Sequence, residues 1–227
     1  MKTIIKIFSV IICSFFCMQN AGAQTFTSEF KVGLTMAEMD MPNANMYKTP
    51  KYGFSLNMLV GYKFRSGIQF QSGFIMTKRG SRKHEDEFTR DDQDNYIYRD
   101  VTSVIDANYM MIPLTMGYET NTNKPLAFNI NFGVYGARGF KGKSKREGVV
   151  RNYVGNVVLA ESTIDEEWDT FSPNNLKRLD YGALANASLI YSSVIMTVSY
   201  EYGLMNVSNT SQEMKHRNLS VALGMRF

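Results

Sequence analysis

The chain has 227 residues, enough for one large domain or two small ones. Its mean hydropathy of -0.23 excludes a protein built from membrane-spanning helices, and its net charge of +4 gives no support for a nucleic-acid partner. Aromatic residues make up 13% of the chain, with 15 Phe and 13 Tyr against one Trp. This composition favours β-strands, because aromatic side chains fit a pleated surface.

Residues 1–23 are predicted to be a cleaved secretory signal peptide, and residues 24–227 a single β-barrel domain. The signal has a basic start, an apolar core over residues 7–18 and the small-residue cleavage motif Ala21-Gly22-Ala23. Secretion through this signal is expected to carry the mature domain out of the cytoplasm.

Two other interpretations of this first segment are weaker. A membrane anchor would need a longer apolar run to cross about 30 Å of hydrocarbon as a helix. A lipoprotein would need a small residue before the modified cysteine, whereas Cys13 follows Ile12 and Cys17 follows Phe16. Both cysteines leave with the signal, so the mature domain is predicted to have no disulfide and no Cys-based metal or nucleophile site.

Eight segments alternate apolar and polar residues with a period of two, which predicts half-buried strands. In chain order they are residues 29–37, 52–63, 68–78, 107–118, 126–137, 179–191, 194–204 and 218–227. Pro113 interrupts the fourth segment and predicts a bulge or an unpaired position there. The last segment ends on an aromatic residue, as closing strands of outer-membrane barrels do. We expect the signal for the barrel-assembly machinery to comprise Tyr202, Leu223, Met225 and Phe227.

The connections between these segments alternate between long and short along the chain. The short ones follow the second, fourth and sixth segments. Residues 79–106 are interpreted as a charged loop too polar to cross a bilayer or join a core. Residues 138–177 form the longest connection, which begins basic and becomes acidic, and residues 149–159 within it are expected to form a hairpin. This pattern predicts an antiparallel up-and-down barrel with tight periplasmic turns, long outer loops and both termini in the periplasm.

A soluble eight-stranded ligand-binding barrel, like a lipocalin, is the rival interpretation, with its apolar face turned inward. Two features favour a transmembrane barrel in the outer membrane of a Gram-negative bacterium. The apolar faces carry Tyr and Phe at their ends, as membrane girdles do. The other faces are mostly Gly, Ala, Ser, Asn, Gln and Thr, whereas a water-facing surface would be rich in charge.

Four motifs resemble the eight-stranded outer-membrane barrel family of Bacteroidota that is often called PorT-like, a porin-family group. They are F-Q-S-G-F-I-M-T-K-R-G at 70–80, N-Y-M-M-I-P-L-T-M-G-Y at 108–118, D-Y-G at 180–182 and S-Y-E-Y-G-L-M-N-V at 199–207. The chain departs from the family where it has Ser72-Gly73 in place of Pro-Glu. The resemblance implies an envelope location more than a task. The family's named member assists a secretion system, and that role is not carried over.

The barrel interior is expected to be filled by side chains, without an open pore. The residues predicted to line it are Lys31, Asn57, Gln69, Gln71, Asn129, Asn131, Asn186, Glu201 and Arg226. Of these, Lys31, Glu201 and Arg226 are expected to form an internal charge network. Such a network either serves an ion path or gate, or simply satisfies buried charges by pairing them.

Three functional classes remain open. The leading one is surface interaction through long loops, with a cell-surface protein or a polysaccharide as partner and membrane lipid around the barrel. Its candidate residues are Phe140, Tyr153, Trp168 and Phe171. Envelope structure is the bland form of this class, and an accessory role in secretion or uptake is an alternative.

Enzymatic function and metal binding are weaker interpretations. A Ser–His pair of the kind some outer-membrane barrels use on lipids could involve only His84 or His216, both expected in solvated loops. The carboxylates of Asp91, Asp92 and Asp94 offer oxygen ligands for a divalent cation but lack the spacing of a calcium loop. No enzyme activity, cofactor or metal is therefore expected.

Overall fold

The computed structural model describes residues 25–40, 47–90, 95–120, 125–154, 157–173, 175–210 and 213–227. The predicted signal peptide lies outside these residues. The regular structure within them consists of β1 (Thr25–Asp40), β2 (Tyr47–Thr49), β3 (Lys51–Lys63), β4 (Ile68–Arg90), β5 (Asn95–Glu119), β6 (Leu126–Lys141), β7 (Lys143–Val154), β8 (Val157–Asp169), β9 (Leu179–Tyr191), β10 (Val194–Gly203) and β11 (Lys215–Arg226). None of the described segments is a helix long and apolar enough to cross a membrane.

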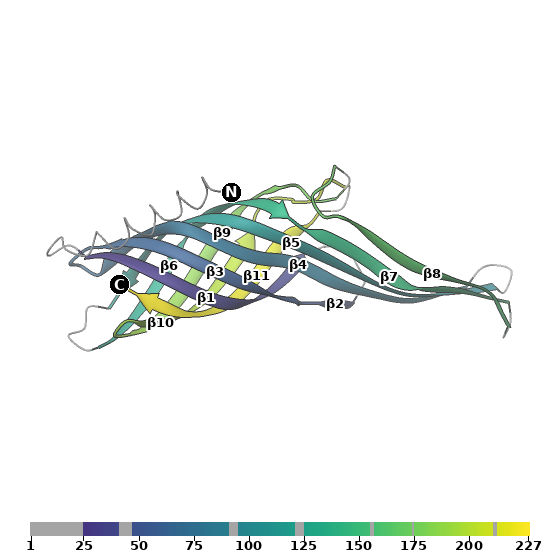
Figure 1. Cartoon of the computed structure of the whole chain (residues 1–227), viewed down its shortest axis with the longest axis horizontal. Coiled ribbons are helices and arrows are strands. Elements are labelled where there is room, and N and C mark those ends of the chain that lie inside the picture. The colour runs from purple at the N-terminus through teal and green to yellow at the C-terminus, as the bar shows by residue number, and fades with distance from the viewer. Residues whose placement is uncertain are drawn as a thin grey trace, which may run out of the picture.

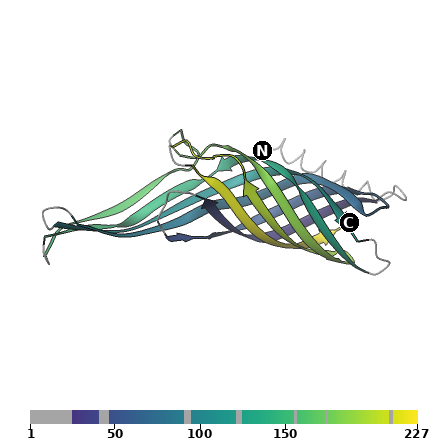
Figure 2. The same cartoon turned by 180° about the vertical axis from the view of Figure 1, so that it is seen from behind.

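Eight of these strands close into an antiparallel barrel (Figures 1 and 2). Around the ring they run β1, β3, β4, β5, β6, β9, β10 and β11, and β11 pairs again with β1. The closing ladder sets Phe30 opposite Met225 and Lys31 opposite Gly224. The predicted eight-stranded up-and-down barrel is therefore confirmed, and closure leaves its strands without a free edge.

The tight connections lie at the end of the barrel where β1 begins and β11 ends (Figure 1). After β3, the backbone N–H of Gly67 donates to the carbonyl of Phe64 at 3.0 Å. After β9, Ser192 has a φ of 55° in a two-residue turn before β10. The long connections lie at the opposite end, which confirms the predicted alternation of short turns and long connections.

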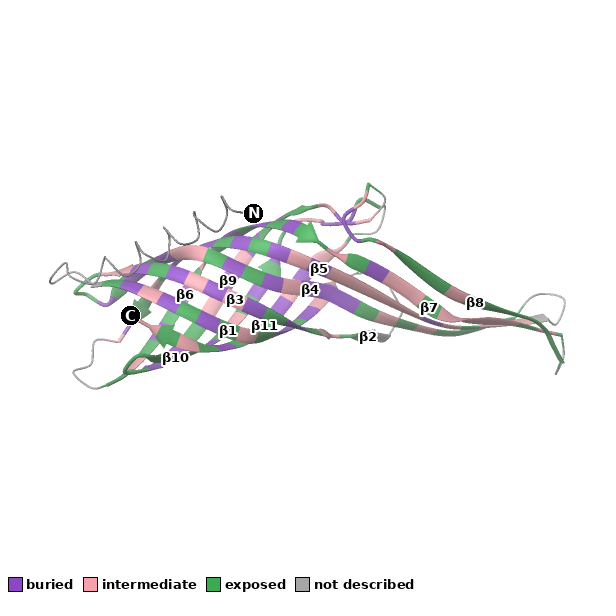
Figure 3. Ribbon diagram, in the orientation of Figure 1, coloured by how far each residue is buried: buried purple, intermediate pink, exposed green. Residues whose placement is uncertain are grey.

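The apolar face of the barrel points outward. Leu34 is 63% exposed, Leu114 61% and Phe132 63%, whereas the inward-facing Lys31 and Gln69 are 2% and 0% exposed. Buried and exposed residues consequently alternate along each barrel strand (Figure 3). A water-soluble barrel would show the reverse arrangement, so the lipocalin-like alternative is wrong. An apolar outer face is stable only against hydrocarbon.

The predicted irregularity at Pro113 is present on one side of its strand. The ladder between β4 and β5 pairs Ser72 with Leu114 and Ile75 with Met111 but omits the two positions between them. The Ser72 hydroxyl instead donates to the Pro113 carbonyl at 2.8 Å. The register is the same on both sides of the gap, so the proline, which lacks an N–H, removes ladder bonds without shifting the strands.

The interpretation of residues 79–106 as a loop was wrong. β4 continues to Arg90, β5 begins at Asn95, and the two pair throughout that stretch. β7 adds to β5, and β8 adds to β7, so residues 81–90, 95–105, β7 and β8 form a sheet of four long strands, and the short β2 pairs with residues 82–84 at its β4 edge. We call this sheet the arm; it projects from the barrel as a single layer (Figures 1 and 2). Residues 149–154 of β7 pair with residues 157–163 of β8, which confirms the hairpin predicted there as part of the longer β7–β8 ladder.

Candidate functional site: a filled interior and a projecting arm

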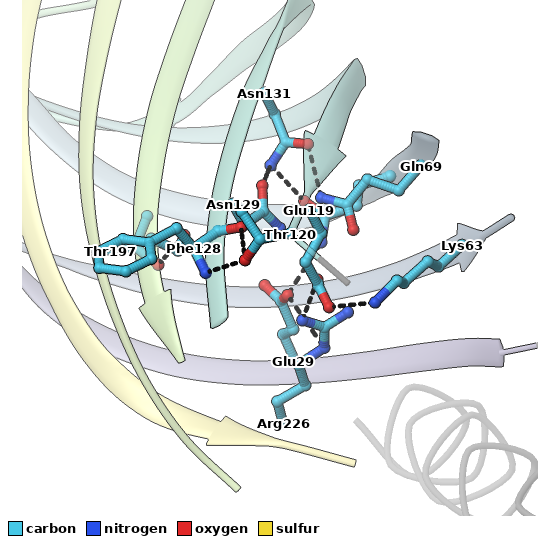
Figure 4. A network of polar contacts seen from close by, with 12 residues as sticks. Glu29, Lys63, Gln69, Glu119, Thr120, Phe128, Asn129, Asn131, Thr197 and Arg226 are labelled. Atoms are coloured by element: carbon cyan, nitrogen blue, oxygen red, sulfur yellow. Dashed lines mark hydrogen bonds and ion pairs between the residues drawn. The ribbon is translucent and has the colours of Figure 1, made fainter. Parts of the chain in front are cut away.

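The turn-end half of the interior is held by a chain of ion pairs (Figure 4). Lys31 Nζ lies 2.7 Å from Glu29 Oε2. Arg226 Nε lies 3.9 Å from Glu29 Oε1, and its NH1 lies 2.5 Å from Glu119 Oε2. Lys63 Nζ approaches the other oxygen of Glu119 at 2.7 Å. Since buried charges are stable only when paired, this chain closes the barrel's turn end with satisfied groups.

A layer of amides lies beside these ion pairs. Gln69 Nε2 donates to Asn131 Oδ1 at 2.7 Å, and Asn131 Nδ2 lies 2.7 Å from Asn129 Oδ1 and 2.9 Å from Asn186 Oδ1. Gln71 links the two groups, because its Nε2 donates to Glu29 at 2.9 Å. Three different strands, β4, β6 and β9, contribute, so the layer ties together parts of the barrel that are distant in the sequence.

Arg79 is the centre of a second cluster, and its side chain is fully buried. NH1 donates to Asp180 Oδ2 at 2.6 Å, and NH2 donates to Glu201 Oε2 at 2.7 Å. The guanidinium also lies over the rings of Tyr135 and Tyr109, with centroid distances of 4.8 and 5.2 Å. Two carboxylates and two ring faces thus compensate one buried cation.

The arm end of the barrel is closed by rings and aliphatic side chains. Tyr109 packs edge-on against Phe171 at 5.5 Å, and its hydroxyl lies 3.2 Å from His216 Nε2. Leu176 and Val207 belong to the same buried cluster. The connection between β8 and β9 therefore packs into this end of the barrel.

Taken together, the two ionic networks contain equal numbers of positive and negative groups. They join four cations and four carboxylates, namely Lys31, Lys63, Arg79 and Arg226 with Glu29, Glu119, Asp180 and Glu201. Between them lies a cavity of about 20 Å³, lined in part by Asn57, Asn186 and Glu201. A space of this size holds about one water molecule.

The residues predicted to line the lumen do lie inside the barrel. Seven of the nine are buried, while Asn186 and Arg226 are partly buried. The single predicted network of Lys31, Glu201 and Arg226 is wrong in part. Lys31 and Arg226 both approach Glu29, whereas Glu201 belongs to the separate Arg79 cluster.

The sequence interpretation missed Glu29, Arg79, Glu119 and Asp180 as interior partners. Arg79 was assigned to a loop, although it continues the inward phase of Ile75 and Thr77 along β4. Glu119 was assigned to a turn, although it is the last residue of β5. Extending each strand's alternation by one or two residues would have found both.

Opposite charges on facing strands hold the arm together. Arg151 Nε lies 2.8 Å from Glu161 on β8, Lys145 Nζ lies 3.4 Å from Asp165, and Lys143 also pairs with Glu167. The hydrogen bond from Arg151 to Glu161 raises the pKa of the guanidinium. The basic-then-acidic sequence of residues 138–177 therefore arises because a basic strand, β7, pairs with an acidic strand, β8, in a hairpin.

The arm carries exposed apolar side chains toward its tip. Phe88 is 63% exposed and stacks at 5.3 Å on Tyr96, over which Arg90 lies at 5.5 Å. Val157 and Leu159 at the tip are 64% and 67% exposed.

The four predicted loop residues occupy different places. Tyr153 and Trp168 are half-buried on the arm, Phe140 is exposed at the end of β6, and Phe171 is buried beneath Arg178 in the barrel mouth. Phe171 therefore cannot be a surface contact. The predicted assembly residues Tyr202, Leu223, Met225 and Phe227 all point outward from the last two strands or the carboxy terminus.

The two histidines differ in environment. His84 is exposed on β4, with Nδ1 3.1 Å from Thr102 Oγ1. His216 was expected in a solvated loop, but it is 2% exposed and faces the interior of the barrel. Among the described residues no group of His, Cys, Asp and Glu could hold a metal ion, and Asp91, Asp92 and Asp94 lie outside them.

Comparisons with solved structures find outer-membrane barrels with low sequence identity. The attachment invasion locus protein Ail of Yersinia pestis, solved with the heparin analogue sucrose octasulfate, is 17% identical with a TM-score of 0.42, over 89% of this chain and 99% of that chain. Neisserial surface protein A is 16% identical with a TM-score of 0.35, over 90% and 99%. The translocator domain of the autotransporter NalP from Neisseria meningitidis is 8% identical with a TM-score of 0.26, over 95% and 93%.

No curated protein matches the chain. A family model does match, over residues 19–209, and its description is "Outer membrane protein beta-barrel domain". That range covers well over half of the chain and includes the arm and every barrel strand except β11. The protein therefore belongs to the outer membrane protein beta-barrel domain family, and its barrel spans the outer membrane.

Proposed function

We propose that the barrel is a membrane anchor and that the arm is a device for binding a partner outside the cell. In this orientation the turn end and both chain termini face the periplasm. The partner is a cell-surface protein or a polysaccharide, and barrel-assembly machinery acts only during biogenesis. The proposed role is non-catalytic.

The observation that carries this proposal is the exposed apolar tip of the arm. Val154, Val157, Val158 and Leu159 are all at least 43% exposed, and they lie far from the hydrocarbon-facing belt. Surface apolar groups gathered beyond a membrane anchor are typical of a contact region. The arm is a single-layer sheet without a core of its own. Its length holds the tip at a distance from the barrel (Figure 1).

The filled interior supports an interaction role over a transport role. The ion-pair chain, the amide layer and the Arg79 cluster occupy successive levels of the lumen. The resemblance to PorT-like proteins of Bacteroidota fits this proposal in location. It also keeps an accessory role beside a secretion or uptake system within the same class.

Site-specific photo-crosslinking tests the proposal. A photoreactive residue at position 160, next to Leu159 on the tip, is expected to give a defined cross-linked product on intact cells. Combining it with Val157→Ser and Leu159→Asn should reduce that product about tenfold, because the apolar contact area is removed.

The control pair is Ser162→Ala with Thr163→Ala, exposed positions on the same strand. These changes should leave the product at its original level. The proposal fails if position 160 gives no product, or if the product persists at full yield after the tip is made polar. Heat-dependent gel mobility of the barrel verifies folding of each variant.

A further inference from the structure

We propose that the outer surface of the barrel holds one acyl chain of a membrane lipid whose head group carries a net-negative phosphate. The proposed site is a groove of about 400 Å³ on the arm-ward half of the barrel. Lipid binding in this groove does not depend on the partner proposed for the arm.

The groove crosses five neighbouring strands. Val32 of β1, Phe54 of β3, Met76 and Lys78 of β4, Asn108 of β5 and Phe140 of β6 line it. Five strands at about 4.8 Å spacing give a length of about 19 Å, which suits an extended acyl chain. Four of these six side chains are apolar and at least 40% exposed, so the groove is built for hydrocarbon.

The arm-ward end of the groove is cationic. Lys78 Nζ lies 2.8 Å from Asp106 Oδ2, and Lys51 Nζ lies 2.7 Å from the same oxygen. Arg82 is exposed four residues further along β4, and its charge and that of Lys78 both act on Lys51. Three cations thus face one carboxylate among the described residues there, which leaves an excess of positive charge for an anionic head group.

The backbone at Gly80 leaves room for the Lys51 side chain beside Lys78. Gly80 has a φ of +147°, and a Cβ there would lie 2.0 Å from the carbonyl of Ile105 and 3.3 Å from Cδ of Lys51. The glycine lets the Lys51 chain pass across β4 to reach Asp106. Lys51 and Lys78 are thereby held on one carboxylate at the arm-ward end of the groove.

A second groove on the same barrel provides an internal comparison. It measures about 510 Å³ and is lined by residues such as Phe26, Phe70 and Met116, with no charged side chain among its lining residues. Hydrocarbon alone would fill both grooves equally. The proposal is that only the groove at Lys78 selects the charge of the head group.

Native mass spectrometry of the full mature chain tests this selection. The protein is released from neutral detergent after incubation with phosphatidylglycerol or with zwitterionic phosphatidylcholine. The wild type is expected to retain one phosphatidylglycerol molecule at least fivefold more often than phosphatidylcholine. Lys78→Gln with Arg82→Gln should bring the two lipids to equal retention, and Lys78→Arg should keep the preference because it keeps the charge.

Arg217→Gln is the matched control, since Arg217 is an exposed cation on β11, 2.5 Å from Asp40 and away from the groove. This variant should retain the wild-type preference. Equal retention of both lipids by the wild type would overturn the proposal. An undiminished preference for phosphatidylglycerol in the Lys78/Arg82 variant would also overturn it. So would an equal loss of that preference in Arg217→Gln, because the selection would then not belong to the groove at Lys78. If the neutral variant folds poorly, the comparison of the two lipids on the wild type and on Arg217→Gln still decides the outcome.

Discussion

At the scale of single residues, Arg79 organises the polar contacts in the barrel interior. Its guanidinium replaces water with Asp180, Glu201 and two aromatic faces in a site without solvent access. The cost of desolvating three charges is large, and their mutual attraction offsets it only while all three are present. Removing one partner should therefore cost more than removing the whole set.

Arg79→Met is expected to lower the free energy of unfolding by about 3–5 kcal/mol, because two buried carboxylates lose their cation. Adding Asp180→Asn and Glu201→Gln should restore most of that loss. Urea unfolding in detergent, followed by circular dichroism, measures each value. A triple variant no more stable than Arg79→Met would show that the ion pairs are not what Arg79 contributes.

The exposed pair of Arg217 and Asp40 is a comparison for that measurement. Both side chains are about 40% exposed, so solvent screens their interaction. Arg217→Gln should change stability by no more than about 1 kcal/mol.

β4 shows at the element scale how one strand can serve two environments. Its first half has an apolar outer face in the barrel, and its second half, apart from Phe88, is polar on both faces in the arm. Gly80 lies between them with a backbone conformation that other residues rarely adopt. The strand can therefore leave the barrel wall and still remain paired with β5.

Gly80→Ala is expected to destabilise the protein by about 1–3 kcal/mol, because the new Cβ would meet the Ile105 carbonyl at a strained φ. Gly136→Ala on β6 is the matched control, since no atom lies within 4 Å of a Cβ built there. That change should be neutral or slightly stabilising. Equal urea midpoints for the two variants would show that the conformation of β4 does not require a glycine at position 80.

At the scale of the whole molecule, the closed ring separates two ends with different chemistry. The turn end has connections of a few residues, and the other end carries the arm. An arm of this polarity is compatible with water and not with hydrocarbon, so the arm must lie on one side of the membrane. Which side it occupies follows from the proposed periplasmic position of the termini.

Single cysteines test that orientation, because the only cysteines of the sequence lie within residues 1–23. Leu159→Cys on the arm is expected to react with a membrane-impermeant maleimide on intact cells. Ser192→Cys in the β9–β10 turn should react only after the outer membrane is opened. The reverse pattern of labelling would place the arm in the periplasm and contradict the proposed function.

The sequence alone determined the barrel strands, their faces and the order of short and long connections. A two-residue period against lipid is a local property, so it can be read without knowing which strands are neighbours. The arm was not predicted, because strands that pack on no core need no apolar face, and residues 81–90 therefore have the composition of a loop.

Only the tertiary structure decided which interior charges meet. Arg79 and Glu201 are 122 residues apart, and Arg226 and Glu119 are 107 apart. Their contact depends on the register of closure and on the tilt of the strands, which no single strand encodes. The same holds for His216, whose burial follows from its place opposite Tyr109 in the closed ring rather than from its polar neighbours in the sequence.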